Sequence, residues 1–388
     1  MKNPTSSSKL AYISGSKYLP PELWTLILPK LPAKTLLKFR CVGKSWCSTI
    51  DEPDFVHLHF QLSLINSGNN NKLFVALEGM GYLLTVRDAE TLRNTGSIFS
   101  KSYWFGILGS CNGLLLVEKH DYYSYKEFRL WIFASLNTGS IFSKSSIRKS
   151  LHLPPCPLDR CRYLFGFAPD SQDFKVVAFT IDKAFAIYTL SNQQWTVRNN
   201  LLNVPNLNTN NFLGLFSSLS TSVFFRGVTY CLEQNYRDSS GFSHLGSFAF
   251  DEENITFLKL PFSWDGMSFS FLFLLGESLA VFSISETTSR IWMLQQNNQK
   301  EPWILWFSGK SSQDGYEVFR FCYRNCRKVF YCESDGGYFA CGKKTYNIAS
   351  CQVQEVKEDI SCLVKLETYM ESLVLSKVYG ARDLRNFP

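Results

Sequence analysis

Apolar residues recur at helical spacing in one stretch near the start of the chain, residues 19–60. Leu23, Leu26, Ile27 and Leu31 are three or four residues apart, which is the period of one face of an α-helix. Prolines stand where this helix would begin and where it would end. The spacing therefore predicts a first short helix here.

Two further short helices are predicted after it. The second covers residues 33–40 and carries Leu36 and Leu37, Gly43 breaks it, and the third carries Trp46. A short turn is expected to close the stretch. About 40 residues are too few to bury all these apolar side chains alone. The module should therefore pack on the rest of the chain or dock on another protein.

From residue 72 onward the pattern changes to short apolar runs separated by Gly, Asn, Asp and Ser, such as "LFVAL", "FKVVAFTI" and "SVFFRGVTYCL". Roughly twenty such runs of strand-like composition follow one another, with no comparable helical pattern between them. Evenly spaced strands over this length predict a β-propeller, which extends sheet radially without long exposed edges. Two stacked β-sandwiches are the alternative.

Composition supports a globular protein rich in strands, with 45% apolar, 15% aromatic and 19% charged residues. The net charge of +7 forms no basic helix or long basic run, so nucleic acid is not an expected partner. The most apolar stretch, residues 269–284, is broken by Gly276-Glu277-Ser278 and reads as two strands rather than a membrane span. No signal-peptide pattern is evident, so we expect a cytoplasmic and/or nuclear protein with its 12 cysteines reduced.

Candidate catalytic and metal-binding residues do not form recognisable constellations. Cys156 and Cys161 flank a Pro-rich loop, and no His lies close on their far side. Four later cysteines lack tight C-x₂-C spacing and nearby His; they are Cys322, Cys326, Cys332 and Cys341. No Ser or Cys nucleophile stands at a recognisable spacing from a base, and no phosphate-binding Gly loop is present. We therefore expect no catalytic residue, no metal and no cofactor.

The helical stretch carries a long series of residues in a fixed order: Leu19, Pro20, Glu22, Ile27, Leu28, Leu31, Pro32, Lys34, Leu36, Leu37, Phe39, Arg40, Cys41, Val42, Lys44, Ser45, Trp46, Pro53, Phe55 and His59. This series closely resembles the F-box. The resemblance implies that the helices bind the Skp adaptor subunit of a cullin-based ubiquitin ligase. A departure is Pro29, where the family usually has a polar residue; it should shorten the first helix.

The resemblance implies an adaptor-binding set made of Leu19, Pro20, Leu23, Ile27, Leu28, Leu31, Pro32, Leu36, Leu37, Arg40, Val42, Lys44 and Trp46. Its large apolar members either pack the module or face the partner, and the sequence does not separate these roles. Pro20, Pro32, Arg40 and Lys44 are less easily explained as core residues, so they are the better interface candidates.

The strand-rich part resembles a second family. "LGSCNGLLLV" at residues 108–117 is followed in order by "FGFAPDSQDFKVVAF", "YTLSNQQW", "FFRGVTYCL", "SFAFDEENITFLKLP" and "TYMESLVL". This series is similar to the F-box-associated interaction domain of plant F-box proteins. The similarity implies a kelch-related, β-propeller-like receptor domain. Within it, Asn112-Gly113 is a dipeptide suited to a tight primed turn.

Together these patterns predict an α+β multidomain chain: a disordered tail at 1–17, a three-helix F-box at 18–60, an all-β propeller-like domain at 61–375 and a tail at 376–388. The expected function is substrate recognition in an SCF-type ubiquitin ligase. The expected partners are the Skp adaptor, through it a cullin, and a protein substrate of unknown identity, with no nucleic acid and no membrane. A propeller enzyme of glycan hydrolase or oxidase type and a non-ligase scaffold are the alternatives.

The segment "NTGSIFSKS" occurs twice word for word, at residues 94–102 and 137–145. A structural repeat diverges while keeping its apolar spacing, whereas the residues that flank these two copies do not match. We interpret residues 132–145 as a short, recently copied insertion in a loop between strands, or as an error in the gene model. The copy carries no evidence for repeated blades.

Overall fold

The computed structural model describes residues 21–70, 73–78, 83–88, 93–99, 103–121, 129–134, 149–159, 161–180, 184–198, 221–232, 244–261, 269–275, 278–284, 288–295, 302–310, 323–324, 328–331, 344–347, 352–355, 365–369, 373 and 382–383.

The N-terminal helices form what we call the helical module, residues 21–70. Its elements are α1 (Pro21–Ile27), the 3₁₀ helix η1 (Leu28–Lys30), α2 (Ala33–Phe39), α3 (Lys44–Asp51) and α4 (Pro53–Asn70). Pro29 falls in η1, and α1 ends just before it, as expected. The short turn predicted after α3 is wrong: α4 is an 18-residue helix. Pro53 at its start and Asp54 in its first turn both favour a helix N-terminus there.

The strands of the described residues form six antiparallel sheets. Sheet 1 consists of β24 (Lys365–Tyr369), β1 (Leu73–Glu78), β2 (Leu83–Asp88) and β3 (Asn94–Phe99). Sheet 2 consists of β4 (Tyr103–Cys111), β5 (Leu114–Asp121), β6 (Arg129–Ala134), β7 (Lys149–His152) and β25 (Arg382–Asp383). Sheet 3 consists of β8 (Arg162–Ala168), β9 (Asp173–Phe179), β10 (Phe185–Thr189) and β11 (Gln194–Arg198). Sheet 4 consists of β12 (Thr221–Phe225), β13 (Val228–Leu232), β14 (His244–Ala249) and β15 (Asn254–Lys259). Sheet 5 consists of β16 (Phe269–Leu275), β17 (Ser278–Ile284), β18 (Thr288–Leu294) and β19 (Trp303–Lys310). Sheet 6 consists of β20 (Tyr323–Arg324), β21 (Lys328–Tyr331), β22 (Lys344–Asn347) and β23 (Gln352–Glu355).

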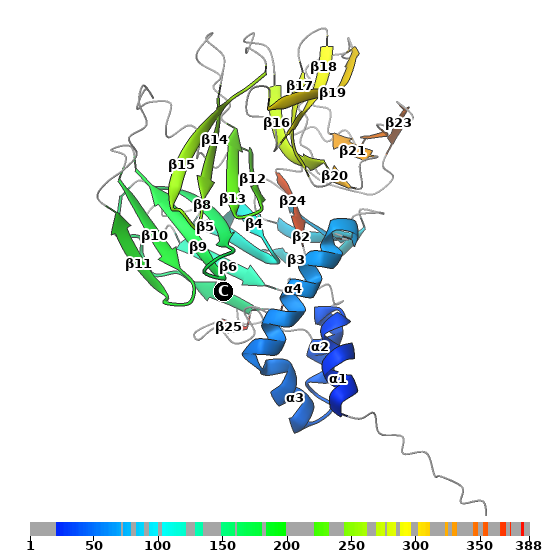
Figure 1. The fold of residues 1–388 in the computed structure, drawn as a ribbon, viewed down its shortest axis with the longest axis vertical. Coiled ribbons are helices and arrows are strands. Elements are labelled where there is room, and N and C mark those ends of the chain that lie inside the picture. The colour runs from blue at the N-terminus through cyan, green and yellow to red at the C-terminus, as the bar shows by residue number, and fades with distance from the viewer. Residues whose placement is uncertain are drawn as a thin grey trace, which may run out of the picture.

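The first strands of the sheets gather at the centre of this β body. Strand β4 contacts β8, β12 and β24, and strand β16 contacts β12 and β20, while later strands of each sheet lie progressively outward. Strand β24, late in the chain, pairs with β1 and completes the first sheet, so the inner edge of that sheet is not left open. Figure 1 shows the sheets ranged about the centre with the helical module projecting from one side. The predicted fold class, helices followed by a propeller-like all-β domain, is confirmed.

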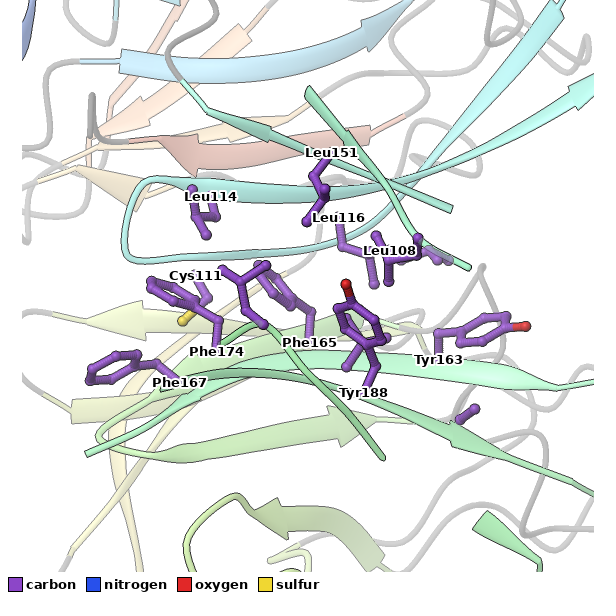
Figure 2. Close-up of a cluster of buried hydrophobic side chains, with 14 of the residues drawn as sticks. Leu108, Cys111, Leu114, Leu116, Leu151, Tyr163, Phe165, Phe167, Phe174 and Tyr188 are labelled. Atoms are coloured by element: carbon purple, nitrogen blue, oxygen red, sulfur yellow. The ribbon is translucent and has the colours of Figure 1, made fainter. Parts of the chain in front are cut away.

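Sheets 2 and 3 face each other across an apolar core. Figure 2 shows Leu114 and Leu116 on β5 directed toward Phe165 and Phe174 of sheet 3. The rings of Phe165 and Phe174 are stacked with centroids 6.0 Å apart, and both residues are buried. Strands in this region are buried on both faces, so their sequences read as continuous apolar runs rather than as alternation.

Two hairpin turns use residues with positive φ. Asn112 and Gly113 have φ of 47° and 83° between β4 and β5, which confirms the predicted primed turn. Arg226 and Gly227 have φ of 48° and 81° between β12 and β13. Turns of this kind match the right-handed twist of the two strands that they connect.

A structural repeat is present, although the copied segment is not its source. The indole Nε1 of Trp195 on β11 donates to the Pro154 carbonyl, 2.9 Å away, just after sheet 2 ends. The indole Nε1 of Trp303 on β19 donates to the Lys259 carbonyl, 2.8 Å away, at the end of sheet 4. In each case the last strand of one sheet is tied to the chain at or just after a late strand of the preceding sheet, and "LHLP" and "LKLP" contain the two acceptors.

The first copied segment includes strand β3, and the second copy, at 137–145, lies outside the described residues. The expectation that residues 132–145 lie wholly in a loop is wrong for the first three of them. Ile132 is on β6, where it pairs with Leu116 on one side and Leu151 on the other. Pairing on both sides makes this backbone part of sheet 2.

Sheets 3 and 4 are also joined by charge. The Nζ of Lys175 donates to Glu253 Oε1 at 2.9 Å and to the carbonyl of Phe250 at 2.9 Å. Arg198 donates to Glu253 Oε2 at 2.7 Å. Burial by itself would raise the pKa of Glu253, but the hydrogen bonds from the two cations outweigh it and lower that pKa.

Replacing Glu253→Gln is expected to lower the free energy of unfolding by about 1–2 kcal/mol, because the buried Lys175 ammonium loses its anion. The lowered pKa means that the stabilisation is present above the pKa of an unfolded Glu and is lost as pH falls through the folded value. Urea unfolding at pH 7 and pH 4 measures how far the free energy of unfolding falls between the two pH values. This fall should be smaller in the variant than in the wild type. An equal pH effect in both proteins would contradict this assignment.

Helix α4 attaches the helical module to sheet 3. The ring of Phe60 packs on Phe167 and Phe174, with centroids 5.4 and 6.0 Å apart. His57 Nε2 donates to Gln172 Oε1 at 2.7 Å, and Gln172 lies in the turn between β8 and β9. The helical module therefore contacts the β body at the C-terminal end of strand β8.

The segment after β24 makes a second attachment. Leu373 is 2% exposed and belongs to the same buried cluster as Leu36 and Ile50 of the helical module. Further on, β25 pairs with β7, so residues 382–383 of the expected C-terminal tail are in a sheet. No helix among the described residues is long and apolar enough to cross a membrane.

Candidate functional site

The helical module has its own buried core. Leu28, Leu36 and Leu37 from the predicted adaptor-binding set are 3%, 0% and 7% exposed and lie in this core. Leu31 and Trp46 are half-buried and pack against it. These five residues hold the helices together. The spacing in the sequence did not show whether they would do this or contact a partner.

Other members of the set face outward. Leu23 and Ile27 on α1 are 42% and 44% exposed, and Val42, between α2 and α3, is 65% exposed. Pro32 and Lys44 are also exposed, as expected of interface candidates. Leu19 and Pro20 lie outside the described residues. Binding of the adaptor by these side chains stays a prediction.

Leu26 was not in the predicted set, yet it is 62% exposed. It follows Leu23 by three residues and precedes Ile27, so the three side chains share one face of α1. We call Leu23, Leu26 and Ile27 the α1 apolar face. The helical spacing of the sequence contained this signal, but spacing does not say whether a face points inward or outward.

Arg40 has an internal partner. Its Nη2 donates to Asp51 Oδ2 at 2.7 Å, which ties the end of α2 to the end of α3. Burial of the guanidinium opposes its charge, but the hydrogen bond and charge of Asp51 prevail and raise the pKa of Arg40. Arg40 therefore stabilises the module, and it is a weaker interface candidate than the sequence suggested.

His59 ties α4 to the junction before α2. The residue is 3% exposed, and its Nε2 donates to the carbonyl of Leu31 at 3.0 Å. Burial lowers the pKa of His59, with the Leu31 hydrogen bond opposing this. The imidazole is therefore neutral in the folded module near neutral pH.

The pH dependence of stability follows from this lowered pKa. The unfolded His59 takes up a proton near its ordinary pKa of about 6.5, and the folded one does so only at lower pH. We expect the contribution of His59 to stability to be complete above the unfolded pKa of about 6.5 and to fall as the pH drops below it. Thermal unfolding at pH 7.5 and 5.5 should show a smaller pH effect in His59→Gln than in His152→Gln, which changes an exposed histidine. Identical pH effects in the two variants would contradict the role of His59.

The described residues contain no group of three or more His, Cys, Asp and Glu side chains that could hold a metal ion. Of the cysteines considered from the sequence, Cys156 and Cys161 have their sulfur atoms 3.7 Å apart. Cys322, Cys326, Cys332 and Cys341 lie outside the described residues.

The two ends of strand β8 define two faces of the β body. The turn at Gln172, at one end, contacts the helical module. Residues 153–159 and 161 precede the strand at its other end. β8 has 7 residues, and at a strand rise of about 3.3 Å each these ends are roughly 20 Å apart. We call the face that carries residues 153–161 the distal face.

Comparison with known proteins agrees with this architecture. A family model described as "F-box associated beta propeller domain" matches residues 75–378, and one described as "F-box domain" matches residues 18–58. The chain belongs to the F-box-associated β-propeller family. Its helical module is an F-box domain, as the sequence pattern predicted.

Several Arabidopsis thaliana proteins are similar to this F-box protein. F-box protein At2g14710 is 24% identical over 248 residues, covering 63% of this chain and 59% of the relative. F-box/kelch-repeat protein At3g23880 is 28% identical over 173 residues, covering 41% and 44%. In both cases the chain spans less than two thirds of the length of the relative that it matches.

Solved structures match with low scores. A Desulfotomaculum acetoxidans protein of unknown function has a TM-score of 0.41 at 10% identity, with 78% of this chain and 100% of that chain covered. The β-propeller domain of Myceliophteria thermophila Cps50 (Swd1) has a TM-score of 0.40 at 11% identity, with 77% and 83% covered. Scores this low carry no argument about function.

Proposed function

We propose that this F-box protein is the substrate-recognition subunit of an SCF-type ubiquitin ligase. The F-box would dock on the Skp adaptor and, through it, on a cullin, and the β body would bind the protein to be ubiquitinated. The observation that carries the proposal is the α1 apolar face: three exposed apolar side chains on one helix of an F-box domain. An exposed apolar face of this kind suits a helical partner.

The attachment between the two domains supports the same role. Phe60 of the helical module is 5% exposed and packs in the core of the β body. Leu373, which follows β24, is 2% exposed and packs in the core of the helical module. A receptor fixed to its docking module holds a bound substrate at a defined distance from the rest of the ligase. Holding the substrate lysine near a charged ubiquitin carrier makes the transfer effectively intramolecular. In this proposal the chemistry belongs to other subunits, and the complex acts in the cytoplasm or nucleus.

Adaptor docking is tested by co-purification of the Skp adaptor with the full chain. The double substitution Leu26→Asp and Ile27→Asp places charges on the α1 apolar face without altering the core cluster. Truncation of a central interface residue typically costs at least about 2 kcal/mol, so affinity should fall at least about 30-fold. The control is Val197→Asp, which places a charge at an apolar position on β11 that is 41% exposed, against 62% for Leu26 and 44% for Ile27. Equal recovery of the adaptor with both folded variants would overturn the docking assignment.

Leu31→Ala is a poorer test, because Leu31 packs against the core of the module and its loss would disturb folding as well as docking. A ligase receptor is distinguished from a non-ligase scaffold by a second experiment. Proximity labelling with proteasome inhibition should recover proteins whose turnover slows when Leu26→Asp and Ile27→Asp are introduced. Adaptor binding without any protein whose turnover depends on this face would favour the scaffold.

A further inference from the structure

Two thiols face each other in the loop between sheet 2 and sheet 3, on the distal face. The Sγ atoms of Cys156 and Cys161 are 3.7 Å apart. Both side chains are half-buried and pack, with Leu158, against the core shared by the two sheets. Disulfide sulfurs are about 2.05 Å apart, so these two atoms must approach by about 1.7 Å to form a bond.

The loop is held in place around the pair. Trp195 donates to the Pro154 carbonyl at 2.9 Å, which fixes the start of the loop against sheet 3. Cys161 Sγ also lies 3.2 Å from the carbonyl of Leu158, so the thiol is directed into the loop. Packing and hydrogen bonding of the loop therefore help to hold the two sulfur atoms close together, in addition to the short sequence separation of the two cysteines.

We propose that Cys156 and Cys161 form a dithiol–disulfide site that closes on reaction with hydrogen peroxide. The proposal concerns a covalent modification of this chain and does not depend on the ligase function. It adds a reversible state to a pair that the sequence suggested only as reduced thiols.

Hydrogen bonding assigns the two sulfurs different tasks. The hydrogen bond between the two sulfurs, in which either thiol can donate, lowers the pKa of Cys156 and raises the pKa of Cys161. The thiolate is the reactive form of a cysteine, so the proposal takes Cys156 as the nucleophile and Cys161 as the thiol that resolves the intermediate.

The reaction balances in two steps. The Cys156 thiolate attacks one peroxide oxygen, an S–O bond forms, the O–O bond breaks, and the departing hydroxide takes a proton to become water. The Cys161 sulfur then attacks the sulfenic sulfur of Cys156, the S–S bond forms, the S–O bond breaks, and the hydroxide leaves as water with the proton of the Cys161 thiol. Two thiols are oxidised to one disulfide while one peroxide is reduced to two waters.

Other described cysteines provide internal controls. Cys111 and Cys231 are 2% and 0% exposed, so peroxide has little access to them. Burial also raises the pKa of the Cys111 thiol well above its usual range. Both should remain reduced at a peroxide concentration that closes the distal pair.

The sequence makes the product easy to identify. Trypsin cuts after Lys149, Arg160 and Arg162, so Cys156 and Cys161 fall on two different peptides, residues 150–160 and 161–162. The full chain is treated with hydrogen peroxide, its remaining free thiols are alkylated, and the digest is analysed by mass spectrometry without reduction. We expect the two peptides to be recovered as one disulfide-linked species, which a thiol reductant separates again.

Two variants test the assigned tasks. In Cys161→Ser the sulfenic acid on Cys156 has no resolving thiol and should be trapped by a dimedone probe, whereas Cys156→Ser should not react at this loop. Melting temperatures of both variants establish that they are folded. Recovery of residues 150–160 fully alkylated after peroxide treatment would overturn the proposal. Equal dimedone labelling of Cys156 in wild type and Cys161→Ser would also overturn it.

Discussion

Replacing Gly166→Ala is expected to lower the free energy of unfolding by about 3 kcal/mol, near the upper end of the usual cost of overpacking a core. Gly166 is buried on β8, and a Cβ at this position would overlap the ring of Phe250. Phe250 is 0% exposed and packs edge-on against Phe248, with centroids 5.0 Å apart. The ring therefore has little room to move away, and sheets 3 and 4 would have to separate.

Urea unfolding measures this effect, and Gly109→Ala is the matched control. Gly109 is also a buried glycine in an inner strand, but a Cβ there would meet Phe165 at 3.4 Å, an ordinary contact. A second substitution, Phe250→Leu, should recover part of the lost stability in the Gly166→Ala background, because the two sites share one contact. Equal losses for Gly166→Ala and Gly109→Ala would contradict the proposed overlap.

Leu373→Ala should destabilise the F-box domain by about 2–5 kcal/mol, the range for large-to-small changes at buried leucines. Leu373 is 2% exposed among Leu28, Leu36 and Phe55. Hydrogen exchange should therefore accelerate in α2 and α3 more than in sheets 3 and 4. The control Leu58→Ala removes a leucine on α4 that is 41% exposed, and its effect should be small. Unchanged exchange in α2 and α3 would show that this contact contributes little.

The elements of this fold were largely predictable from local pattern. Helix boundaries followed Pro29, Pro32 and Gly43, because proline and glycine act on the backbone within a few residues. The Asn112-Gly113 turn was predictable for the same local reason. The length of α4 was not, since its stability depends on packing of Phe60 against sheet 3, more than 100 residues away in the chain.

Roles within the candidate site were less predictable. The F-box resemblance named Leu28 and Ile27 together, yet one is buried and the other exposed. Arg40 was expected at the interface because it is less easily explained as a core residue, but its partner Asp51 is 11 residues away on another helix. Sequence spacing reports which residues share a helix face, whereas tertiary packing decides which face is covered.

Leu373 also has a consequence for the order in which the chain is made. The F-box helices leave the ribosome before Leu373, a side chain of their core that lies more than 300 residues later in the chain. A chain still in synthesis therefore carries an F-box whose core is incomplete. Because β24 comes just before Leu373 in the chain, the same short segment closes sheet 1 and completes the F-box core. A nascent chain that lacks Leu373 should therefore hold its F-box helices less stably than a chain that contains it.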